Sequence, residues 1–274
     1  MRRLAVLGHP VGHSRSPAMH TEALKALAER GLEGKWTYDP IDVAPDELED
    51  RVREMAAADF VGANVTIPHK EAALRLADTA SPVARAIGAA NTLSFAAGKI
   101  HADNTDAGGL IEALRGLPAS PRGVRALVLG AGGAARASIW ALAQAGGVVY
   151  VWNRTPSRAR DVYDELGEQM RLGGAPVESP RQGDYGIVVN TTSVGLRGED
   201  PFEHLPLHPR QFAGQVVVDM VYGDRPSKLI EVAEREGADV VDGIEILVRQ
   251  GALSLEAWTG RKPPLDAMRA GARG

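Results

Sequence analysis

The 274-residue sequence contains no cysteine. Disulfide bonds, thiolate catalysis and cysteine-ligated metals are therefore excluded, and we expect no metal site. A strong excess of one charge sign is also missing, because the formal net charge is only −4, which argues against nucleic acid or an anionic membrane as the main partner. The opening "MRRLAVLGHP" has an apolar run that ends at Gly8, well short of a signal-peptide core or a membrane span. We expect a soluble, cytoplasmic protein with a small-molecule partner, acting as a monomer or homodimer.

Hydrophobic residues make up 44% of the chain, enough to bury one large core or two modest ones. In the first third, short apolar segments alternate with helical patterns. The predicted strands cover 4–8, 36–43, 60–67, 91–95 and 99–103, and the predicted helices cover 17–31, 45–58 and 105–117. Because strand and helix alternate, we expect a mostly parallel sheet.

A turn-rich segment, "PASPRG" at 118–123, is a candidate entry to a second unit. Residues 124–155 contain a strand, a glycine turn, a helix and a second strand, which together form a βαβ unit. Further strands are predicted at 185–192 and 215–222, a helix at 227–237 and a long amphipathic helix at 243–260. We interpret the final "RAGARG" as a low-complexity tail.

The glycine turn of the βαβ unit, "GAGGAA" at 130–135, fits the dinucleotide-binding pattern G-x-G-x-x-A. Glycines allow a tight turn and close approach of the backbone to a pyrophosphate, which lies at the helix N-terminus where free N–H groups favour anions. The alternative is a glycine turn without a ligand. A match inside a complete βαβ unit is much more specific than the motif alone, so we predict a dinucleotide site.

The end of the second strand of this unit indicates which nucleotide is bound. In an NAD site, an Asp or Glu there binds the ribose 2′-hydroxyl. This strand instead runs into "NRTPSR", with Asn153, Arg154 and Arg158 and no acid. Arginines pair with a 2′-phosphate by charge and by forked hydrogen bonds, so NADP is favoured over NAD. The alternative is that both arginines are solvated loop residues.

Polar residues suited to a substrate are concentrated before residue 110 and on the last helix. Ser14 is a candidate ligand, whereas Ser16, which precedes a proline, is also typical of a helix N-cap. Asp106 precedes a helix and could simply complement its dipole. Asn91 could be a turn residue at a strand entry. Gln250 lies either at the edge of the apolar stripe of the last helix or in a polar site.

The stretch "NVTIPHK", residues 64–70, alternates like a half-buried strand until a proline ends the pattern just before a lysine. Asn64 and Thr66 would share one face of this strand, and a helical turn starting at Pro68 would present Lys70 beside them. A helix N-terminus opposes a positive charge by about 0.3 to 1 kcal/mol. That effect is too small to make a lysine a base at neutral pH.

In chain order, the motifs "HSRSP", "NVTIPHK", "GAANTL", "NTDAGG", "GAGGAAR", "NRTPSR", "NTTSVG", "DMVY" and "DGIEILVRQ" resemble those of the shikimate dehydrogenase family and span nearly the whole chain. The resemblance implies a two-domain α/β enzyme that catalyses the reversible NADPH-dependent reduction of 3-dehydroshikimate to shikimate in aromatic amino acid (chorismate) biosynthesis. It implies a substrate-binding catalytic domain at 1–105, a Rossmann-type NADP-binding domain at 106–238 and a helical segment at 239–274 that returns to the first domain.

Carried over by position, the resemblance implies that Lys70 and Asp106 are the catalytic pair. It implies that the substrate is bound by Ser14, Ser16, Asn64, Thr66, Lys70, Asn91, Asp106, Tyr222 and Gln250. It implies that NADP is bound by Gly130, Ala131, Gly132, Gly133, Ala134, Asn153, Arg154, Thr155, Arg158, Thr192, Ser193, Met220 and Gly243. The chain departs from the family pattern at Leu196, Ala90 and Ile246, where the family often has methionine, valine and methionine. These exchanges between apolar side chains affect packing more than chemistry.

Reduction of a ring ketone requires a hydride on carbon and a proton on oxygen. We hypothesise that Lys70 and Asp106 act as a coupled pair, in which the lysine carries the proton and the aspartate orients the lysine and a substrate hydroxyl. Two alternatives remain. One is a quinate/shikimate dehydrogenase that uses NAD, against which the two loop arginines argue. The other is a catalytically silent NADP-binding regulator on the same scaffold, which would have little use for this polar set.

Overall fold

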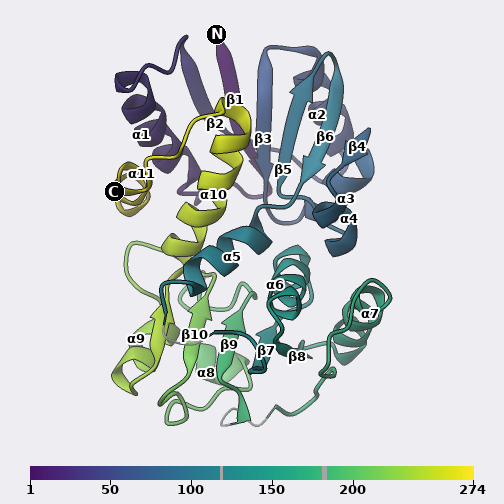
Figure 1. The fold of residues 1–274 in the computed structure, drawn as a ribbon, viewed down its shortest axis with the longest axis vertical. Helices are drawn as coiled ribbons and strands as arrows, with labels where there is room; N and C mark the ends of the chain where they lie inside the picture. The colour runs from purple at the N-terminus through teal and green to yellow at the C-terminus, as the bar shows by residue number, and fades with distance from the viewer. Residues whose placement is uncertain (118–119, 181–183) are drawn as a thin grey trace. The chain divides into compact units, whose positions relative to one another are not determined.

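The computed structural model describes residues 1–117, 120–180 and 184–274. These residues divide into two compact units. Unit 1 comprises residues 1–109 together with 247–274, and unit 2 comprises residues 110–246. Each unit has its own sheet with helices packed against it (Figure 1), which confirms the predicted α/β class.

Unit 1 contains a six-stranded sheet in the order β2-β1-β3-β5-β6-β4. β5 runs antiparallel to both of its neighbours and the other pairs are parallel, so the sheet is mostly parallel as predicted. The strands are β1 (Arg2–Gly8), β2 (Trp36–Asp42), β3 (Phe60–Val65), β4 (Thr79–Ala80), β5 (Thr92–Ala96) and β6 (Lys99–Asp103). The helices are α1 (Ser16–Glu29), α2 (Leu48–Ala57), α3 (Lys70–Leu76), α4 (Pro82–Ile87), α5 (Asp106–Leu114), α10 (Gly243–Thr259) and α11 (Leu265–Arg273), of which α5 and α10 extend into unit 2.

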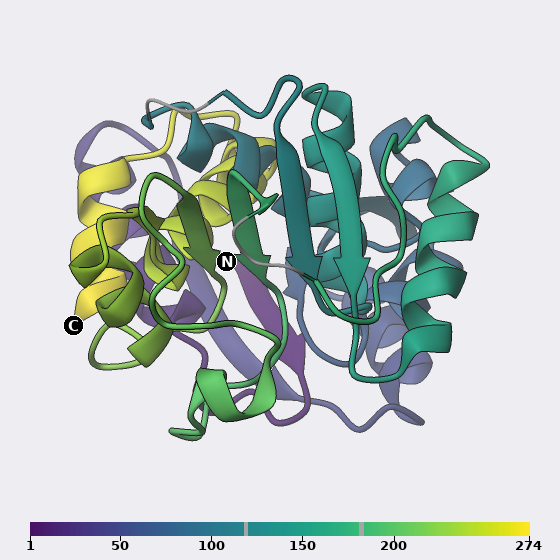
Figure 2. The same ribbon diagram turned by 90° about the horizontal axis from the view of Figure 1, so that it is seen from below.

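Unit 2 contains a five-stranded parallel sheet in the order β11-β10-β9-β7-β8. Figure 2 shows its strands side by side in teal and green. The strands are β7 (Arg125–Leu129), β8 (Val148–Trp152), β9 (Ile187–Asn190), β10 (Val216–Asp219) and β11 (Asp239–Val241). The helices are α6 (Gly133–Gln144), α7 (Pro156–Gly167), α8 (Pro201–His204) and α9 (Lys228–Arg235).

β8 is the last named strand of this sheet, and a short strand-like segment pairs with its outer edge. Residues 172–177 pair with β8 through a parallel bridge between Val151 and Pro176 and through flanking backbone hydrogen bonds. Counting this segment as the third strand of the unit gives the order 3-2-1-4-5-6, which is that of a Rossmann domain. The strand order reverses between β7 and β9, and ligands of such sheets bind beyond the carboxyl ends of the strands at this point.

The predicted half-buried strand over 60–67 is wrong in extent and in exposure. β3 ends at Val65, and both Asn64 and Val65 are buried. β3 lies between β1 and β5 in the middle of the sheet. Because side chains on both faces of a central strand are covered, burial does not alternate along it.

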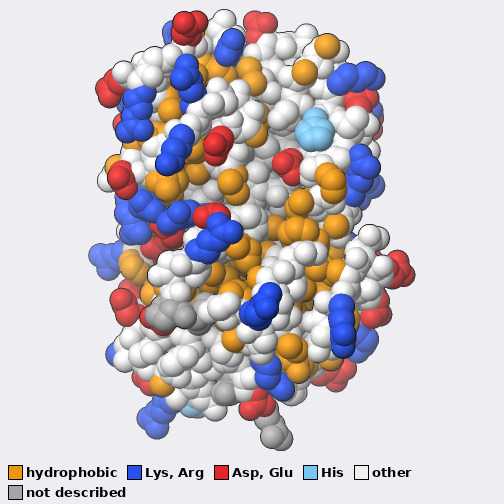
Figure 3. Space-filling model, in the orientation of Figure 1, with side chains coloured by type: hydrophobic (Ala, Val, Ile, Leu, Met, Phe, Trp, Pro, Cys, Tyr) orange, Lys and Arg blue, Asp and Glu red, His pale blue; other side chains and the backbone are white. Residues whose placement is uncertain are grey.

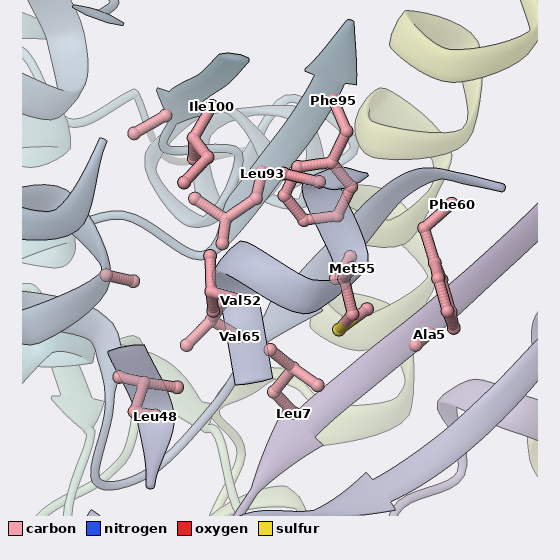
Figure 4. Packing of buried hydrophobic residues seen from close by; sticks show 14 of the residues in the cluster. Ala5, Leu7, Leu48, Val52, Met55, Phe60, Val65, Leu93, Phe95 and Ile100 are labelled. Atoms are coloured by element: carbon pink, nitrogen blue, oxygen red, sulfur yellow. The ribbon is translucent and has the colours of Figure 1, made fainter. Parts of the chain in front are cut away.

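One face of the sheet of unit 1 packs against α2. Leu48, Val52 and Met55 of this helix meet side chains from β1, β3 and β5, as Figure 4 shows. Leu4 and Val6, which alternate with the residues of β1 in this cluster, are equally buried on the opposite face. α10 crosses that opposite face in Figure 1, so the sheet is covered on both sides.

α10 lies close to the sheet because β3 has no side chain at Gly62. The indole of Trp258 fills this space and donates its Nε1–H to the carbonyl oxygen of Leu93 at 3.1 Å. A Cβ at position 62 would lie 2.1 Å from that nitrogen, so any larger residue would displace the helix. The predicted long helix at 243–260 is confirmed by α10.

The final "RAGARG" is not a tail, and this prediction is corrected. α11 includes residues 269–273 and packs against α1. Gly271 and Ala272 are buried, and their small size allows close approach of the two helices, since a Cβ at position 271 would lie 2.7 Å from the carbonyl oxygen of Ala18.

The compact units divide within helices, at 109/110 in α5 and at 246/247 in α10. The boundaries predicted from the sequence, 105/106 and 238/239, coincide instead with the starts of α5 and β11. Within the turn-rich segment 118–123, residues 118 and 119 lie outside the described ranges.

Acidic and basic side chains are intermixed on the face seen in Figure 3. This agrees with a sequence that has 31 Lys and Arg against 35 Asp and Glu. In the described ranges, no helix combines the length and the apolar character needed to cross a bilayer.

Candidate active site

Lys70 is the first residue of α3. After β3 the chain turns through a cis peptide bond between Ile67 and Pro68, and His69 is the helix N-cap. Pro68 thus lies in a turn before the helix and is not its first residue, and this turn presents Lys70. Burial lowers the pKa of His69, and its Nε2 lies 2.8 Å from the carbonyl oxygen of Val43. This contact fixes the turn that presents Lys70.

Lys70 and Asp106 form a nearly buried ion pair. The lysine Nζ lies 2.6 Å from the aspartate Oδ2, and the two side chains are only 13% and 10% exposed. An ion pair withdrawn from water depends strongly on each partner, because removing one charge leaves the other unpaired. Asp106 is also the first residue of α5, so it complements the helix dipole as well as the lysine.

Asn91 holds the second oxygen of Asp106. Its Nδ2 donates to Asp106 Oδ1 at 2.7 Å. The amide cannot be reversed, because Asn91 Oδ1 accepts the backbone N–H of Thr105 at 2.7 Å, and a backbone N–H can only donate. Asn91 is therefore more than a turn residue: it sets the orientation of the aspartate.

Gln250 points into the polar site and not at the edge of the apolar stripe. It is buried, and its Oε1 lies 3.1 Å from Asn91 Nδ2 and 3.5 Å from the hydroxyl of Thr105. Its Nε2 donates to the carbonyl oxygen of Leu247 at 2.9 Å. This side chain brings α10 to the cluster formed by residues near the starts of α5 and β5.

Ser16 is not the N-cap of α1. Arg15 occupies that position, and Ser16 is the first helical residue and is buried. The hydroxyl oxygen of Ser14 accepts a hydrogen bond from the backbone N–H of Ser16 at 3.3 Å. Ser14 thus provides a partner for one backbone N–H at the start of the helix. Thr66 is half-buried just beyond β3. Because β1 and β3 are adjacent and parallel, the segments after them lie at the same edge of the sheet.

Asn64 joins this cluster from the end of β3. It is buried, its Oδ1 accepts the hydroxyl of Tyr38 at 2.8 Å, and its Nδ2 lies 3.2 Å from the carbonyl oxygen of Asn91. The structure therefore links by hydrogen bonds five of the predicted residues, which are Asn64, Lys70, Asn91, Asp106 and Gln250.

The glycine turn of unit 2 has the geometry that a pyrophosphate requires. Gly130 has φ of +121°, and a Cβ there would lie 2.4 Å from the hydroxyl oxygen of Thr191, so only glycine fits. Around Gly132, the N-cap of α6, an added Cβ would meet no atom within 4 Å. The first N–H groups of this helix lack partners in the helix. Residues 130–134 thus fit a dinucleotide.

The "NRTPSR" loop follows β8, and α7 starts within it at Pro156. Asn153 Nδ2 donates to the carbonyl oxygen of Thr155 at 3.0 Å, which shapes the loop. The side chains of Arg154 and Arg158 are exposed. Two exposed guanidinium groups beside the second strand fit the phosphate of NADP better than the free hydroxyl of NAD.

The buried Asp219 ties together the loops after β9 and β10. It accepts hydrogen bonds from Asn190 Nδ2 at 2.8 Å, the backbone N–H of Val221 at 3.1 Å and the hydroxyl of Ser227 at 2.5 Å. Burial raises the pKa of Asp219, and these donors oppose the shift in part. Asn190 Oδ1 in turn accepts the hydroxyl of Thr192 at 2.7 Å. The predicted cofactor and substrate residues on these loops are Thr192, Ser193, Met220 and Tyr222, and Gly243 starts α10.

Several residues of the cluster in unit 1 are missed by sequence reasoning. Thr105 and Thr92 contact the Asn91 side chain, and Tyr38 contacts Asn64. Thr92 directly follows Asn91 in "NTL", and Thr105 directly precedes Asp106 in "NTD". Their position next to predicted site residues is a signal in the sequence that could have identified them. Tyr38 lies in a strand of ordinary β pattern, where nothing in the sequence marks it.

Family models match segments near both ends of the chain. Residues 6–93 match the shikimate dehydrogenase substrate binding domain, and residues 243–272 match the shikimate 5′-dehydrogenase C-terminal domain. A shikimate dehydrogenase (NADP(+)) of Thermus thermophilus is 45% identical, with 100% of this chain and 98% of the relative covered. That of Methanopyrus kandleri is 41% identical, with 97% and 93% covered.

Solved structures agree with these sequence matches over both units. A shikimate 5-dehydrogenase from Thermus thermophilus, in complex with NADP(H) and shikimate, has a TM-score of 0.87 at 42% identity, with 100% of this chain and 99% of that chain covered. Shikimate dehydrogenase from Aquifex aeolicus has a TM-score of 0.89 at 32% identity, with 100% and 98% covered. With relatives this similar along its whole length, the chain belongs to the shikimate dehydrogenase family.

Proposed function

We propose that this protein is an NADP-dependent shikimate dehydrogenase that catalyses the reversible reduction of 3-dehydroshikimate to shikimate. The observation that carries the proposal is the buried pair of Lys70 and Asp106, at 2.6 Å, set among amide and hydroxyl side chains. A polyhydroxylated ring needs several such convergent donors and acceptors. Relatives named shikimate dehydrogenase (NADP(+)), and a solved relative in complex with NADP(H) and shikimate, support this substrate and cofactor.

Lys70 is proposed to move the proton. In reduction, its ammonium group donates a hydrogen bond to the substrate carbonyl oxygen and transfers a proton to that oxygen as the carbonyl carbon is reduced. In oxidation, the amine takes the hydroxyl proton back. Asp106 keeps the lysine in place and accepts a hydrogen bond from a neighbouring substrate hydroxyl. Asn91 prevents the carboxylate from rotating, since it holds the other oxygen at 2.7 Å.

The other proposed substrate groups bind and orient the ring. Hydroxyl groups of Ser14 and Ser16 suit the substrate carboxylate, because each can donate to an anionic oxygen. The substrate hydroxyls are proposed to meet the remaining groups, which are Asn64, Thr66, Asn91, Tyr222 and Gln250. Each of these has an amide or hydroxyl that can both donate and accept.

NADPH, when bound, supplies the hydride. Residues 130–134 would hold its pyrophosphate at the N-terminus of α6. Arg154 and Arg158, with Asn153 and Thr155, would hold the 2′-phosphate. The nicotinamide end would be lined by Thr192, Ser193, Met220 and Gly243.

A four-way assay tests the proposed function. The purified protein is mixed with shikimate or quinate and with NADP or NAD, and the near-ultraviolet absorbance of the reduced nicotinamide is followed. We expect the fastest reaction with shikimate and NADP. Faster reaction with quinate and NAD would favour a quinate/shikimate dehydrogenase instead, and no reaction with any pair would favour a silent NADP-binding regulator.

The two loop arginines are expected to select NADP over NAD. Hydrogen bonds to charged groups contribute about 1.5 to 3 kcal/mol, less at exposed positions, so Arg154→Gln and Arg158→Gln should each raise the KM for NADP by roughly 3- to 20-fold. The KM for NAD, which has no 2′-phosphate, should stay within about 2-fold.

Arg160→Gln is the matched control. Arg160 is another exposed arginine of α7 and pairs with Glu178 at 3.3 Å, so its loss should leave both KM values unchanged. If the control raised the KM for NADP as much as the two loop variants did, general surface charge and not a phosphate contact would explain the preference.

We also propose that the protein acts in the cytoplasm, where reduced NADP is regenerated, as a monomer or homodimer. The proposed catalytic pair and its hydrogen-bond partners all come from one chain. A single copy therefore supplies the complete set.

A further inference from the structure

Tyr38 contacts Asn64, one of the proposed substrate-binding residues. It lies on β2 and is 5% exposed, and its hydroxyl donates to Asn64 Oδ1 at 2.8 Å. This is the shortest hydrogen bond that the Asn64 side chain makes. The contacts of its Nδ2, to the carbonyl oxygen of Asn91 and the hydroxyl of Thr92, are longer, at 3.2 and 3.4 Å.

These contacts define which end of the Asn64 amide is fixed. The carbonyl oxygen of Asn91 can only accept a hydrogen bond, so the amide nitrogen must face it. The amide oxygen then faces Tyr38, which donates. The oxygen end is thus held by the short bond, whereas the nitrogen end makes only the two longer and weaker contacts.

The ring of Tyr38 is itself held in place. It stacks on the ring of His20 from α1, with centroids 4.2 Å apart and planes 10° from parallel. His20 is fully buried. The hydroxyl of Ser254 from α10 lies 3.4 Å from the same amide oxygen of Asn64. Side chains from α1, β2 and α10 thus pack together at the oxygen end of the Asn64 amide.

We infer that Tyr38 is a positioning residue, which fixes the Asn64 amide so that its nitrogen is presented to a hydroxyl of the substrate ring. This inference rests on the proposed function, since Asn64 is proposed there as a substrate-binding residue. Tyr38 contributes to the binding of substrate without contacting it. An interaction of this kind acts equally on the ground state and the transition state, and its loss raises KM without lowering kcat.

Tyr38→Phe removes only the hydroxyl and keeps the ring that stacks on His20. We expect the KM for shikimate to rise about 3- to 10-fold, the range that corresponds to one lost hydrogen bond, with kcat within 2-fold and the KM for NADP unchanged. The matched control is Tyr163→Phe in unit 2, where the lost hydroxyl donates to the carbonyl oxygen of Gly174 at 2.6 Å. It should leave the KM for shikimate unchanged.

A double-mutant cycle separates action through Asn64 from any other effect. In an Asn64→Ala background, or in Asn64→Ser if the alanine variant does not fold, Tyr38→Phe should change the KM for shikimate by less than 2-fold. The same rise in both backgrounds, or an unchanged KM in the single variant, would overturn the inference. Wild-type turnover, measured in the same assay, tests the proposed function separately. An inactive wild-type protein would contradict both the proposed function and the inference on Tyr38. If the wild-type protein is active, the variants alone decide whether Tyr38 positions Asn64.

Discussion

Replacing Lys70 by methionine should lower kcat about 10²- to 10⁴-fold, which is the usual contribution of a positioned general acid or base. Methionine keeps most of the side-chain volume but has no proton to give. The KM for shikimate should change much less, because several other groups are proposed to bind the ring. Steady-state kinetics in both directions measure the effect. A variant with nearly normal kcat and a raised KM would assign Lys70 to binding alone.

Stability must be separated from chemistry in this experiment. Lys70→Met leaves the Asp106 carboxylate nearly buried without its partner, and breaking such a pair costs about 3 to 5 kcal/mol. The double variant Lys70→Met/Asp106→Asn removes both charges and should recover much of the stability but none of the activity. Lys99→Met is the matched control in the same unit, because Lys99 pairs with Asp78 at 3.2 Å with its side chain 75% exposed. That variant should keep both activity and stability.

The folded protein should lose stability as the pH falls below 6.5 because of His20. Burial lowers the pKa of His20 from 6.5 to about 3, and the nearby Asn64 side chain opposes this shift only in part. Below pH 6.5 the unfolded chain therefore takes up a proton that the folded protein does not, so stability falls as the pH decreases and is unaffected by this group above that pH. At pH 4.5, two units below the unfolded value, the loss is about 3 kcal/mol.

His20→Phe removes this titration and keeps an aromatic ring stacked on Tyr38. We expect urea unfolding of the wild-type protein to lose about 3 kcal/mol more than the variant between pH 7.5 and pH 4.5. The difference between the two proteins at pH 7.5 reports packing alone and serves as the internal reference. Parallel pH profiles for both proteins would show that His20 is accessible to protons in the folded state.

Long and regular patterns are predictable from this sequence. The βαβ unit at 124–155 and the helix at 243–260 both appear in the structure, because a complete helical or strand period extends over many residues in each. Helices α3 and α4, with seven and six residues, are too short to show a period. The strand-like segment 172–177 pairs only at the edge of β8, and its sequence, LGGAPV, contains two glycines and a proline, which are typical of a turn.

Contacts between distant segments are less predictable. The sequence leaves Gln250 undecided between two environments, and only the packing of α10 on the sheet brings it to Asn91, at 3.1 Å. The N-cap signature of Ser16 is misleading because the helix starts one residue earlier than the proline suggests. Tyr38 is identified only by its distance to Asn64. Side chains that position a site residue without contacting the substrate have no recognisable local sequence pattern, since their partners lie far away in the chain.

The division of unit 1 between the two ends of the chain has a consequence for synthesis on the ribosome. The 137 residues of unit 2, from 110 to 246, are translated between the two parts of unit 1. At about 5 to 20 residues per second, this takes roughly 7 to 27 s. During that interval the nascent sheet of unit 1 has neither Trp258 nor Gln250 to cover it. The middle of the chain can complete its fold first, and the catalytic pair gains its last neighbours only when the final helices leave the exit tunnel.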